Sequence, residues 1–393
     1  MEIKIKTLTP IWTGGVDRKC DRIHETGIIG SLRWWYEAIV RGLGGYACDP
    51  TSKNESKNEK ERCPDKNNNH CAVCEVFGCT GWGRKFRIVI KNDEYLQKVD
   101  SNVRNRKMHH FVPIKGLCTL NNTKDSSPDK PVIIELVSLR MEEMEYRILN
   151  KVFKLIEKYG GLGANLSQGN GIIKIIESEL DTYTTSLSSS NKTIPEWIKE
   201  RAKLGTTTYF PVFDRFFFGE FQLVFNQKID DLLEKNLFFD EGIVNKKPVR
   251  LNKDWKDFWD KFRFLPIAPH IRFAIRSSIS NRNQRHEVFG YVDRNKNYTF
   301  GSKVFVSHGY KVGNQDNSVN FRIYGYSLSD NEIDAIGDFL RQGLEGALFQ
   351  DGKQGGRIKQ LKANSSFLID NGKTTVTQLS QIVVKGEELL NGL

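Results

Sequence analysis

The first 180 residues carry short apolar segments in an order that few folds accommodate. Residues 2–8 (EIKIKTL) alternate apolar and charged side chains, which is typical of a strand with one solvated face. Residues 86–90 (FRIVI) also indicate a strand, and the apolar run at 132–139 (VIIELVSL) is typical of a buried one. A helix is predicted from an N-cap at Ser31 to about Arg41, a second over 141–158, and a last strand at GIIKIIESEL.

Strand, helix, strand, strand, helix, strand is the order of a ferredoxin-like, RRM-type domain, in which two helices back an antiparallel sheet. A chain of 393 residues is long enough for a second domain. We therefore expect an α+β protein of two tandem ferredoxin-like domains, at residues 1–180 and 208–393, joined by a Ser/Thr-rich linker at 181–207. The second domain has expected strands at 217–225, 270–276 and 321–328, a helical aromatic insertion at 228–262, a helix at 329–349 and a glycine-rich loop at 351–356.

An insertion at about residues 46–82 interrupts the first domain. Residues 51–69 nearly lack apolar side chains and cannot bury enough surface to order themselves. The same insertion holds Cys63, Cys71, Cys74 and Cys79, and two thiolates at C-x2-C spacing can reach one Zn²⁺ from a single turn. We predict a structural zinc ion on these four cysteines. His70 is a substitute ligand, and the alternative is free buried thiols, which we expect for Cys20, Cys48 and Cys118.

The positive charge of the chain is concentrated in two windows. The net charge is +11. Residues 84–115 hold nine basic and three acidic residues, and residues 270–311 hold eight and two, so the two windows account for the whole excess. Lys and Arg clustered in this way indicate a polyanionic partner, and nucleic acid in particular. Solvated loops or simple solubility are the alternatives.

Candidate RNA-binding residues lie in these windows and in the N-terminal loops. Trp34 and Trp35 are adjacent, so one must face the core while the other can stack on a base, unless both are buried. The predicted RNA-binding residues are Arg18, Lys19, Arg22, Arg33, Trp34, Arg41, Arg84, Lys85, Arg104, Arg106, Lys107, His109, Arg272, Arg276, Arg282 and Arg285.

A glycine-rich stretch at residues 160–171 follows the second helix. Five glycines allow positive φ and close backbone approach, so exposed amides can bind phosphates. A P-loop requires a strand before the loop and a helix after it, and this loop has the reverse order. A helix-ending turn is the alternative, but such a turn needs one glycine. The glycines are Gly160, Gly161, Gly163, Gly169 and Gly171.

The sequence does not indicate catalysis. No HExxH, GxSxG or GxGxxG motif occurs, and no carboxylate cluster offers a two-metal site. The pair His109–His110 beside Lys107 is the best acid–base candidate, so a metal-independent endoribonuclease remains the alternative. We expect no enzyme activity and no cofactor other than zinc.

The N-terminus lacks the pattern of a signal peptide, and no run approaches the roughly 18 apolar residues that span a membrane. Seven cysteines, with four of them clustered, do not fit a secreted disulfide framework. We therefore expect a cytoplasmic protein without a membrane partner.

Four motifs resemble the RAMP superfamily of CRISPR-associated proteins, in the order in which they occur in that family. They are TLTPIWTGG (7–15), GIIGSLRWWYEAIVRGLGG (27–45), CAVCEVFGCTGWGRKFRI (71–88) and GGLGANLSQGNGIIKI (160–175). Within the superfamily they are similar to the first-numbered subunit of type III-B (Cmr) effectors. The resemblance covers about the first 180 residues, and the cysteine cluster also resembles a feature of the family.

The resemblance implies two ferredoxin-like domains and a non-catalytic subunit near the 3′ end of the guide RNA and the incoming target RNA. Guide RNA, single-stranded target RNA and the other Cmr subunits are the implied partners, and the implied role is antiviral defence. Some RAMP proteins mature guide RNA, which supports the endoribonuclease alternative; a general RNA chaperone is the third hypothesis. Family loops often carry arginines at the centre of the glycine-rich stretch, whereas this loop has residues 165–168 (NLSQ) and leaves phosphate binding to its backbone.

Overall fold

A computed structural model describes most of the chain. The described residues are 1–15, 17, 19–48, 63–65, 67–104, 111–121, 130–187, 192–201, 211–234, 242–244, 247–249, 253–278, 281–293, 298–326 and 375–378. Several predictions fall outside them, namely most of the polar insertion, the helix at 329–349, the glycine-rich loop at 351–356, Arg18, Arg106, Lys107 and His109–His110.

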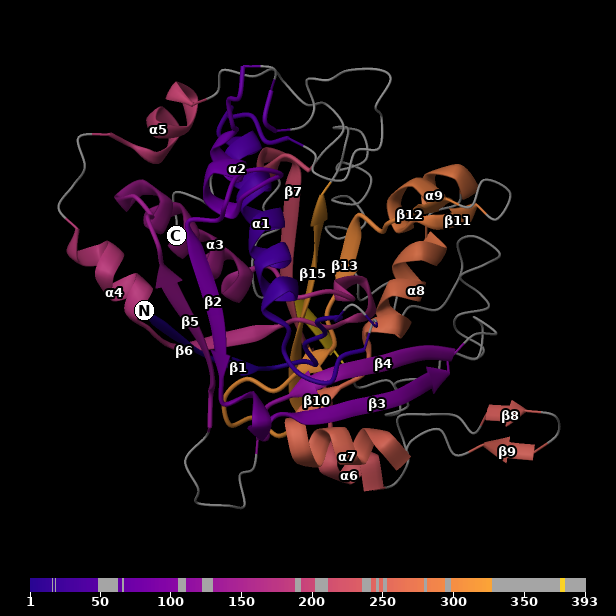
Figure 1. Cartoon of the computed structure of the whole chain (residues 1–393). Coiled ribbons are helices and arrows are strands. Elements are labelled where there is room, and N and C mark those ends of the chain that lie inside the picture. Colours follow the sequence, from indigo (N-terminus) through magenta and orange to yellow (C-terminus); the bar gives the residue numbers. More distant parts are fainter. Residues whose placement is uncertain are drawn as a thin grey trace.

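The N-terminal half, residues 1–187, is built on a four-stranded antiparallel sheet (Figure 1). Its strands are β1 (Glu2–Thr7), β2 (Phe86–Lys91), β5 (Val132–Ser138) and β6 (Ile173–Ser178), in the order β2-β5-β1-β6. The helix α1 (Glu25–Gly42) follows β1, and α3 (Glu143–Lys158) follows β5. The predicted order of strand, helix, strand, strand, helix, strand is thus present, with an antiparallel sheet backed by helices.

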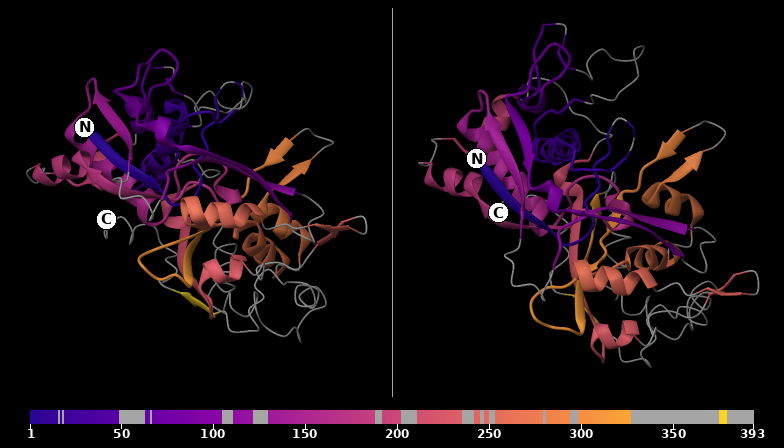
Figure 2. Two further views of the ribbon diagram at one scale, coloured as in Figure 1. Left: turned by 90° about the horizontal axis from the view of Figure 1, so that it is seen from below. Right: turned by 60° about the horizontal axis from the view of Figure 1, so that its bottom comes forward.

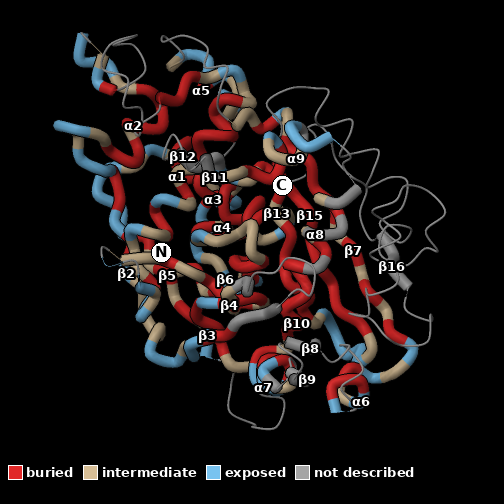
Figure 3. The backbone as a smooth tube through the Cα atoms, turned by 90° about the vertical axis from the view of Figure 1, so that its right-hand side faces the viewer, coloured by how far each residue is buried: buried red, intermediate tan, exposed pale blue. Residues whose placement is uncertain are grey.

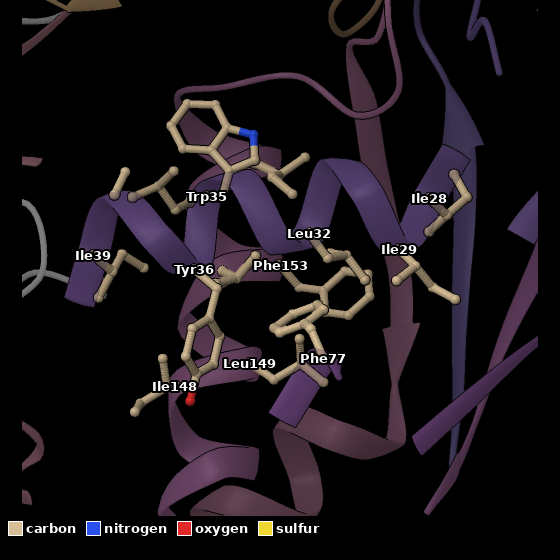
Figure 4. Packing of buried hydrophobic residues seen from close by; sticks show 14 of the residues in the cluster. Ile28, Ile29, Leu32, Trp35, Tyr36, Ile39, Phe77, Ile148, Leu149 and Phe153 are labelled. Atoms are coloured by element: carbon tan, nitrogen blue, oxygen red, sulfur yellow. The ribbon is translucent and has the colours of Figure 1, made fainter. Parts of the chain in front are cut away.

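Alternation places Ile3 and Ile5 of β1 in the core under the two helices, with neither side chain exposed. From α1 and α3, Leu32, Trp35 and Phe153 pack into the same core (Figure 4). The helix α1 begins six residues before the predicted N-cap, because the apolar spacing already starts at Ile28 and Ile29. The prediction that Ser31 caps α1 is therefore wrong.

Two insertions separate β2 from its neighbours in sequence. The short helix α2 (Ala72–Phe77) carries the C-x2-C pair. A hairpin follows β2, formed by β3 (Gln97–Arg104) and β4 (Phe111–Cys118), with a 3-10 turn η1 (Asp93–Tyr95) before it. Val99 and Ile114 of this hairpin are buried in the core of the C-terminal half, and Ser101 hydrogen-bonds Asp254 there. The hairpin therefore reaches from one half to the other (Figure 2).

The C-terminal half, residues 211–326 and 375–378, contains a six-stranded sheet centred on two long strands. The strands β7 (Phe216–Val224) and β15 (Ser318–Tyr326) pair antiparallel over nine residues and are mostly buried (Figure 3). Shorter strands complete this sheet: β10 (Phe264–Leu265), β13 (Val304–Val306), β14 (Gly309–Tyr310) and β16 (Thr375–Gln378). Two small ribbons lie outside it, formed by β8 (Gly242–Val244) with β9 (Lys247–Val249) and by β11 (Tyr291–Asp293) with β12 (Tyr298–Phe300).

Helices of the C-terminal half include a segment that the sequence predicted as a strand. The helices are η3 (Phe213–Arg215), α6 (Ile229–Glu234), α7 (Lys253–Phe262), α8 (Ala268–Ser278) and α9 (Arg282–Phe289). The strand predicted at 270–276 is wrong, because this segment lies within α8. Ile271 and Ile275 are both buried and lie four residues apart. This spacing fits one face of a helix and also one face of a strand, so the sequence pattern could not distinguish the two.

The predicted linker at 181–207 contains helical residues. It overlaps α4 (Glu179–Ser186) and includes α5 (Ile194–Glu200). The helix α5 starts with a capping box, in which Thr193 and Glu196 bind each other's backbone amides.

The two halves share a core. Trp35 of α1 packs against Phe216 of β7 and Tyr324 of β15, with ring centroids 5.5 and 6.4 Å apart. Arg322 donates a hydrogen bond to the carbonyl of Gly160 (3.3 Å). The junction between the halves is therefore a packed interface. None of the described helices is both long and apolar enough to cross a membrane.

Candidate metal centre and junction groove

Four cysteines converge beside the C-terminal end of α1. The sulfurs of Cys48, Cys63, Cys71 and Cys74 all lie within 4.8 Å of one another. Thiolates bound to one tetrahedral Zn²⁺ at about 2.3 Å would be separated by about 3.8 Å, and the Cys48 and Cys74 sulfurs are 3.3 Å apart. The group can therefore hold one metal ion.

Backbone geometry at α2 arranges the sulfurs. Cys71 is the N-cap of α2, and its sulfur accepts a hydrogen bond from the amide of Cys74 (3.4 Å). The amide of Cys71 in turn donates to the sulfur of Cys63 (3.1 Å). Contacts with the sulfurs of Cys48, Cys63 and Cys74 lower the pKa of Cys71, which favours the thiolate form of this side chain.

The predicted ligand set is corrected at one position. Cys79 lies outside the cluster, and its sulfur contacts the carbonyl of Thr80 at 3.8 Å. Cys48 takes its place, although the sequence predicted a free thiol there. Spacing could not reveal this exchange, because 14 residues separate Cys48 from Cys63 and their path is not set by local periodicity. The ring of His70 packs against Trp82, with centroids 4.6 Å apart.

Charged residues of α1 flank the cysteine centre. Arg33 donates to the sulfur of Cys74 (3.2 Å), the carbonyl of Gly78 (2.8 Å) and the carboxylate of Glu37 (2.8 Å). Arg41 is buried and donates to Glu37 at 3.3 Å. Burial raises the pKa of Glu37, which the two guanidinium groups oppose. The predicted RNA-binding residues Arg33 and Arg41 therefore belong to the cysteine centre.

Two further predicted RNA contacts take part in hydrogen-bond networks within the protein. Lys85 is 7% exposed and donates to Glu145, which is fully buried, at 2.6 Å. Arg272 donates to the hydroxyl of Ser302 and to the carbonyls of Val304 and Phe289 at 2.9–3.0 Å. In this structure both side chains already bind protein groups, so RNA contact by either would compete with these bonds.

The remaining described basic residues are more accessible. Lys19 and Arg22 are exposed and form ion pairs with Asp17 and Glu25. Arg84 is exposed, and for Arg104 the structure gives only its place in β3.

Arg276, Arg282 and Arg285 of α8 and α9 form a cluster, which we call the basic cluster. Burial and the charge of Arg285 lower the pKa of Arg276. Burial, followed by the charges of all three arginines, lowers the pKa of His286. These mutually repelling charges favour an anionic partner.

The glycine-rich stretch is braced against the N-terminal segment. The amide of Gly163 donates to the hydroxyl of Ser31 (3.0 Å), that of Ala164 to the carbonyl of Trp12 (2.8 Å), and that of Gly171 to the carbonyl of Pro10 (2.8 Å). A Cβ on Gly163, whose φ is +92°, would lie 2.7 Å from the Trp12 carbonyl oxygen. These three amides therefore hold the loop in place, and phosphate binding by the loop stays a prediction.

An open groove of about 490 Å³ lies where the two halves meet, and we call it the junction groove. One wall comes from α1 and the segment before it, another from the glycine-rich stretch with its 3-10 turn η2 (Leu166–Gln168), and a third from residues around β13 and the end of β15. Its lining residues are Trp12, Thr13, Gly14, Gly27, Gly30, Ser31, Trp34, Trp35, Gly163, Ala164, Asn165, Leu166, Ser167, Gly301, Ser302, Phe305 and Tyr326.

The adjacent tryptophans have different environments. Trp35 is fully buried, and its indole N–H donates to the carbonyl of Gly161 (3.1 Å). Trp34 is partly buried and faces the groove, where its ring packs edge-on against Trp35 (4.9 Å between centroids) and beside Tyr326 (5.8 Å). Of the alternatives left open by the sequence, the structure has one tryptophan in the core and one at an accessible surface.

The open face of the N-terminal sheet lacks the aromatic platform of an RRM. RRM domains stack bases on aromatic side chains of their sheet. The only aromatic residue in β1, β2, β5 and β6 is Phe86, which is fully buried. Accessible aromatic rings gather instead in the junction groove, where Trp12, Phe305 and Tyr326 were not singled out from the sequence. The motif TLTPIWTGG contains Trp12, so the sequence did hold a pattern that could have indicated this residue.

One family model matches most of the N-terminal half. The model of the RAMP superfamily matches residues 4–174, which include most of β1, all of α1, the C-x2-C pair and the glycine-rich stretch. The predicted resemblance to this superfamily is thereby confirmed over that region. No curated protein matches the chain.

Among solved structures, the chain is similar to Cmr1 from Pyrococcus furiosus in its apo form, with 13% identity, a TM-score of 0.37, and coverage of 87% of this chain and 95% of that one. A chain of the type III-B Cmr-beta complex bound to cognate target RNA and AMPPnP gives 13% identity, a TM-score of 0.39 and coverage of 88% and 99%. A chain of a type IV-B CRISPR complex gives 14% identity, a TM-score of 0.30 and coverage of 51% and 98%. All three TM-scores lie below 0.5, so no conclusion is drawn from these likenesses.

Proposed function

We propose that the protein is a non-catalytic RNA-binding subunit of a type III-B (Cmr) CRISPR effector complex. The match to the RAMP superfamily and the four motifs in family order support membership of such a complex. The observation that carries RNA binding is the junction groove, which has aromatic walls and whose Ser302 contacts Arg272 of α8. In this proposal the subunit acts in the cytoplasm and contacts guide RNA near its 3′ end together with incoming target RNA.

The groove and the basic cluster offer complementary contacts. The side chain of Arg272 in α8 joins Ser302 of the groove wall, and β11–β12 connects α9 to Gly301. Phosphates of a single strand can therefore lie along α8 and α9 while its bases reach the aromatic groove. Stacking on aromatic rings combined with a basic track is the usual basis of single-strand binding with weak sequence preference.

The fold proposed for this function is a pair of ferredoxin-like domains. In the N-terminal half the chain order βαββαβ and the sheet order β2-β5-β1-β6 support this proposal. In the C-terminal half, the antiparallel sheet with helices α7 and α8 packed in its core is compatible with a second such domain that carries insertions.

A structural zinc ion on the four clustered cysteines is part of the proposal. The tetrathiolate donor set fits Zn²⁺, which would tie the insertion to α1. Four thiolates and one Zn²⁺ carry a net charge of −2, and Arg33 and Arg41 supply nearby positive charge.

The absence of catalysis is also proposed. The described residues that line the junction groove include no His, Asp, Glu, Lys or Cys side chain that could act as a general acid or base. Among the residues that the structure describes, the cysteine cluster is the only group of three or more candidate metal ligands, so none of the described carboxylates form a cluster of the kind a two-metal site needs. These features favour the binding module over the endoribonuclease alternative.

Co-expression with Cmr subunits and RNA-binding assays test the function. We expect the protein to co-purify with the effector and to alter target binding when it is omitted from the complex. The isolated subunit, incubated with repeat RNA and target RNA with and without Mg²⁺, should not cleave either. Defined cleavage that disappears in a His109→Ala/His110→Ala variant would overturn the non-catalytic assignment.

A further inference from the structure

Gly30 occupies a position where packing does not require a glycine. It lies in the interior of α1, where glycine is unfavourable relative to alanine. A Cβ built on Gly30 would have no atom within 4 Å, whereas a Cβ on Gly27 would lie 2.8 Å from Thr13 and one on Gly42 would lie 2.6 Å from Phe213. The structure thus explains the other two glycines by close contacts and leaves Gly30 with open space above it.

The space above Gly30 belongs to the junction groove. Trp34, one helical turn further on, lines the same groove from the same face of α1. Across the groove, Gly301 also has no atom within 4 Å of a built Cβ. The groove is therefore kept wide by missing side chains at two positions where larger ones would fit.

The lining selects the chemical class of the ligand. Its described residues offer aromatic rings and small hydroxyl and amide groups but no Asp, Glu, His, Lys or Arg side chain, so it suits a flat, neutral group with hydrogen-bonding edges. Positive charge lies beyond its rim, in the basic cluster connected through Arg272 and Ser302. A nucleobase attached to a phosphate backbone combines these two requirements.

Trp34 is held in position before any ligand arrives. Its ring packs edge-on against Trp35 (87° between planes) and Phe305 (88°). A ring fixed in this way loses little conformational freedom when a base stacks on it. Ser31 at the groove wall accepts the amide hydrogen of Gly163, which leaves its hydroxyl hydrogen able to donate to a base edge.

We infer that the junction groove holds one unstacked nucleobase of single-stranded RNA, which lies over Gly30 of α1 and stacks on Trp34. This inference rests on the proposed RNA-binding function and adds the site and the number of bases. Glycine at position 30 then lowers the stability of the helix but leaves space for the ligand.

Gly30→Leu tests the inference, because leucine favours a helix and its side chain would occupy the groove. Gly83→Leu is the matched control, since Gly83 is also exposed with no atom near a built Cβ but lies outside the groove. The probe is a single-stranded RNA of about 12 nucleotides, scanned with one abasic position at a time and measured by fluorescence anisotropy. Melting temperatures at or above that of the wild type in both variants establish that the fold is intact.

We expect Gly30→Leu to weaken binding about tenfold, the loss of one base stack, and Gly83→Leu to leave it unchanged. In the wild type, one abasic position of the probe should weaken binding by about the same factor. In Gly30→Leu, that same abasic position should leave the affinity unchanged. Wild-type affinity in Gly30→Leu, or an identical abasic profile in both proteins, would overturn the inference while RNA binding stands. No RNA binding by the wild type would instead refute the proposed function itself.

Discussion

The two sides of α1 differ in how their polar groups are used. On the cysteine side, which comprises the cysteine centre with Arg33, Glu37 and Arg41 and the neighbouring Lys85–Glu145 pair, buried charges bind one another at 2.6–3.3 Å. The groove side comprises Gly27, Gly30, Ser31 and Trp34, which face an open space whose described lining residues include no charged side chain. One helix thus supports the fold with one face and offers a binding surface with the other.

This difference shows that the accessibility of a charged side chain decides whether it indicates RNA binding. A buried charge must be paired, because removing it from water is costly. The basic residues Arg33 and Arg41 of α1 therefore stabilise the fold. Accessible basic side chains lie elsewhere, at Lys19, Arg22 and Arg84 and on α8 and α9. Substitutions on the cysteine side should therefore destabilise the protein, and substitutions on the groove side should change RNA binding while stability is kept.

The largest effect is expected for Cys71→Ser. Loss of one ligand should release stoichiometric zinc and lower the free energy of unfolding by more than about 4 kcal/mol, since metal binding contributes directly to folding. Elemental analysis and thermal denaturation of protein purified without chelator measure both quantities.

Cys79→Ser is the control, because Cys79 lies outside the cluster. It should retain the metal and the stability of the wild type. Zinc lost in Cys79→Ser but kept in Cys48→Ser would contradict the ligand set, and wild-type protein without zinc would contradict the metal centre.

The next largest effect is expected for Lys85→Met, which leaves the buried carboxylate of Glu145 without its ion-pair partner. Unpairing a buried charge costs about 3–5 kcal/mol. Burial already raises the pKa of Glu145, and removal of Lys85 should raise it further.

A carboxyl group with a raised folded-state pKa favours the fold when it is protonated, and this stabilisation is lost as pH rises through that pKa. The destabilisation by Lys85→Met should therefore be larger at pH 8 than at pH 5, as urea denaturation can measure. The exposed Lys174→Met serves as a control with little effect at either pH. Equal losses at the two pH values would argue against an unpaired carboxylate.

A smaller effect, confined to binding, is expected for the basic cluster. The triple variant Arg276→Ala/Arg282→Ala/Arg285→Ala should bind single-stranded RNA about tenfold more weakly at low salt, independently of sequence. The slope of log affinity against log salt should fall by about 2, since each phosphate contact on a single strand contributes about 0.7. Lys174→Ala, on the open face of the N-terminal sheet, is the control, and an unchanged slope in the triple variant would place the phosphate contacts elsewhere.

The smallest expected effect is an increase in stability, whereas the substitutions above weaken folding or binding. Gly30→Ala should raise the free energy of unfolding by about 0.5–1 kcal/mol, because alanine is the better helix former and its methyl group meets no atom of the protein. Urea denaturation at constant pH measures the change. A loss of stability would show that Gly30 is required by the fold and that the two sides of α1 do not differ in this respect.

Local patterns in the sequence determined the order of elements in the N-terminal half. Alternation in residues 2–8 and helical spacing in residues 141–158 predicted β1 and α3, because each pattern repeats within one element. The same reasoning placed 270–276 in a strand, since a segment of seven residues can satisfy both periods; the burial of Ile271 and Ile275 within α8 decided for a helix.

The sequence by itself also determined the Cys71-x2-Cys74 pair, whose spacing suffices to bring two sulfurs to one turn. Only the tertiary structure decided that Cys48 and not Cys79 joins them, that Arg33 and Arg272 are internally bonded, and that Trp34 lies on a groove shared with Tyr326. These contacts join residues far apart in the chain, and their geometry depends on how the two halves pack, which no short-range spacing encodes.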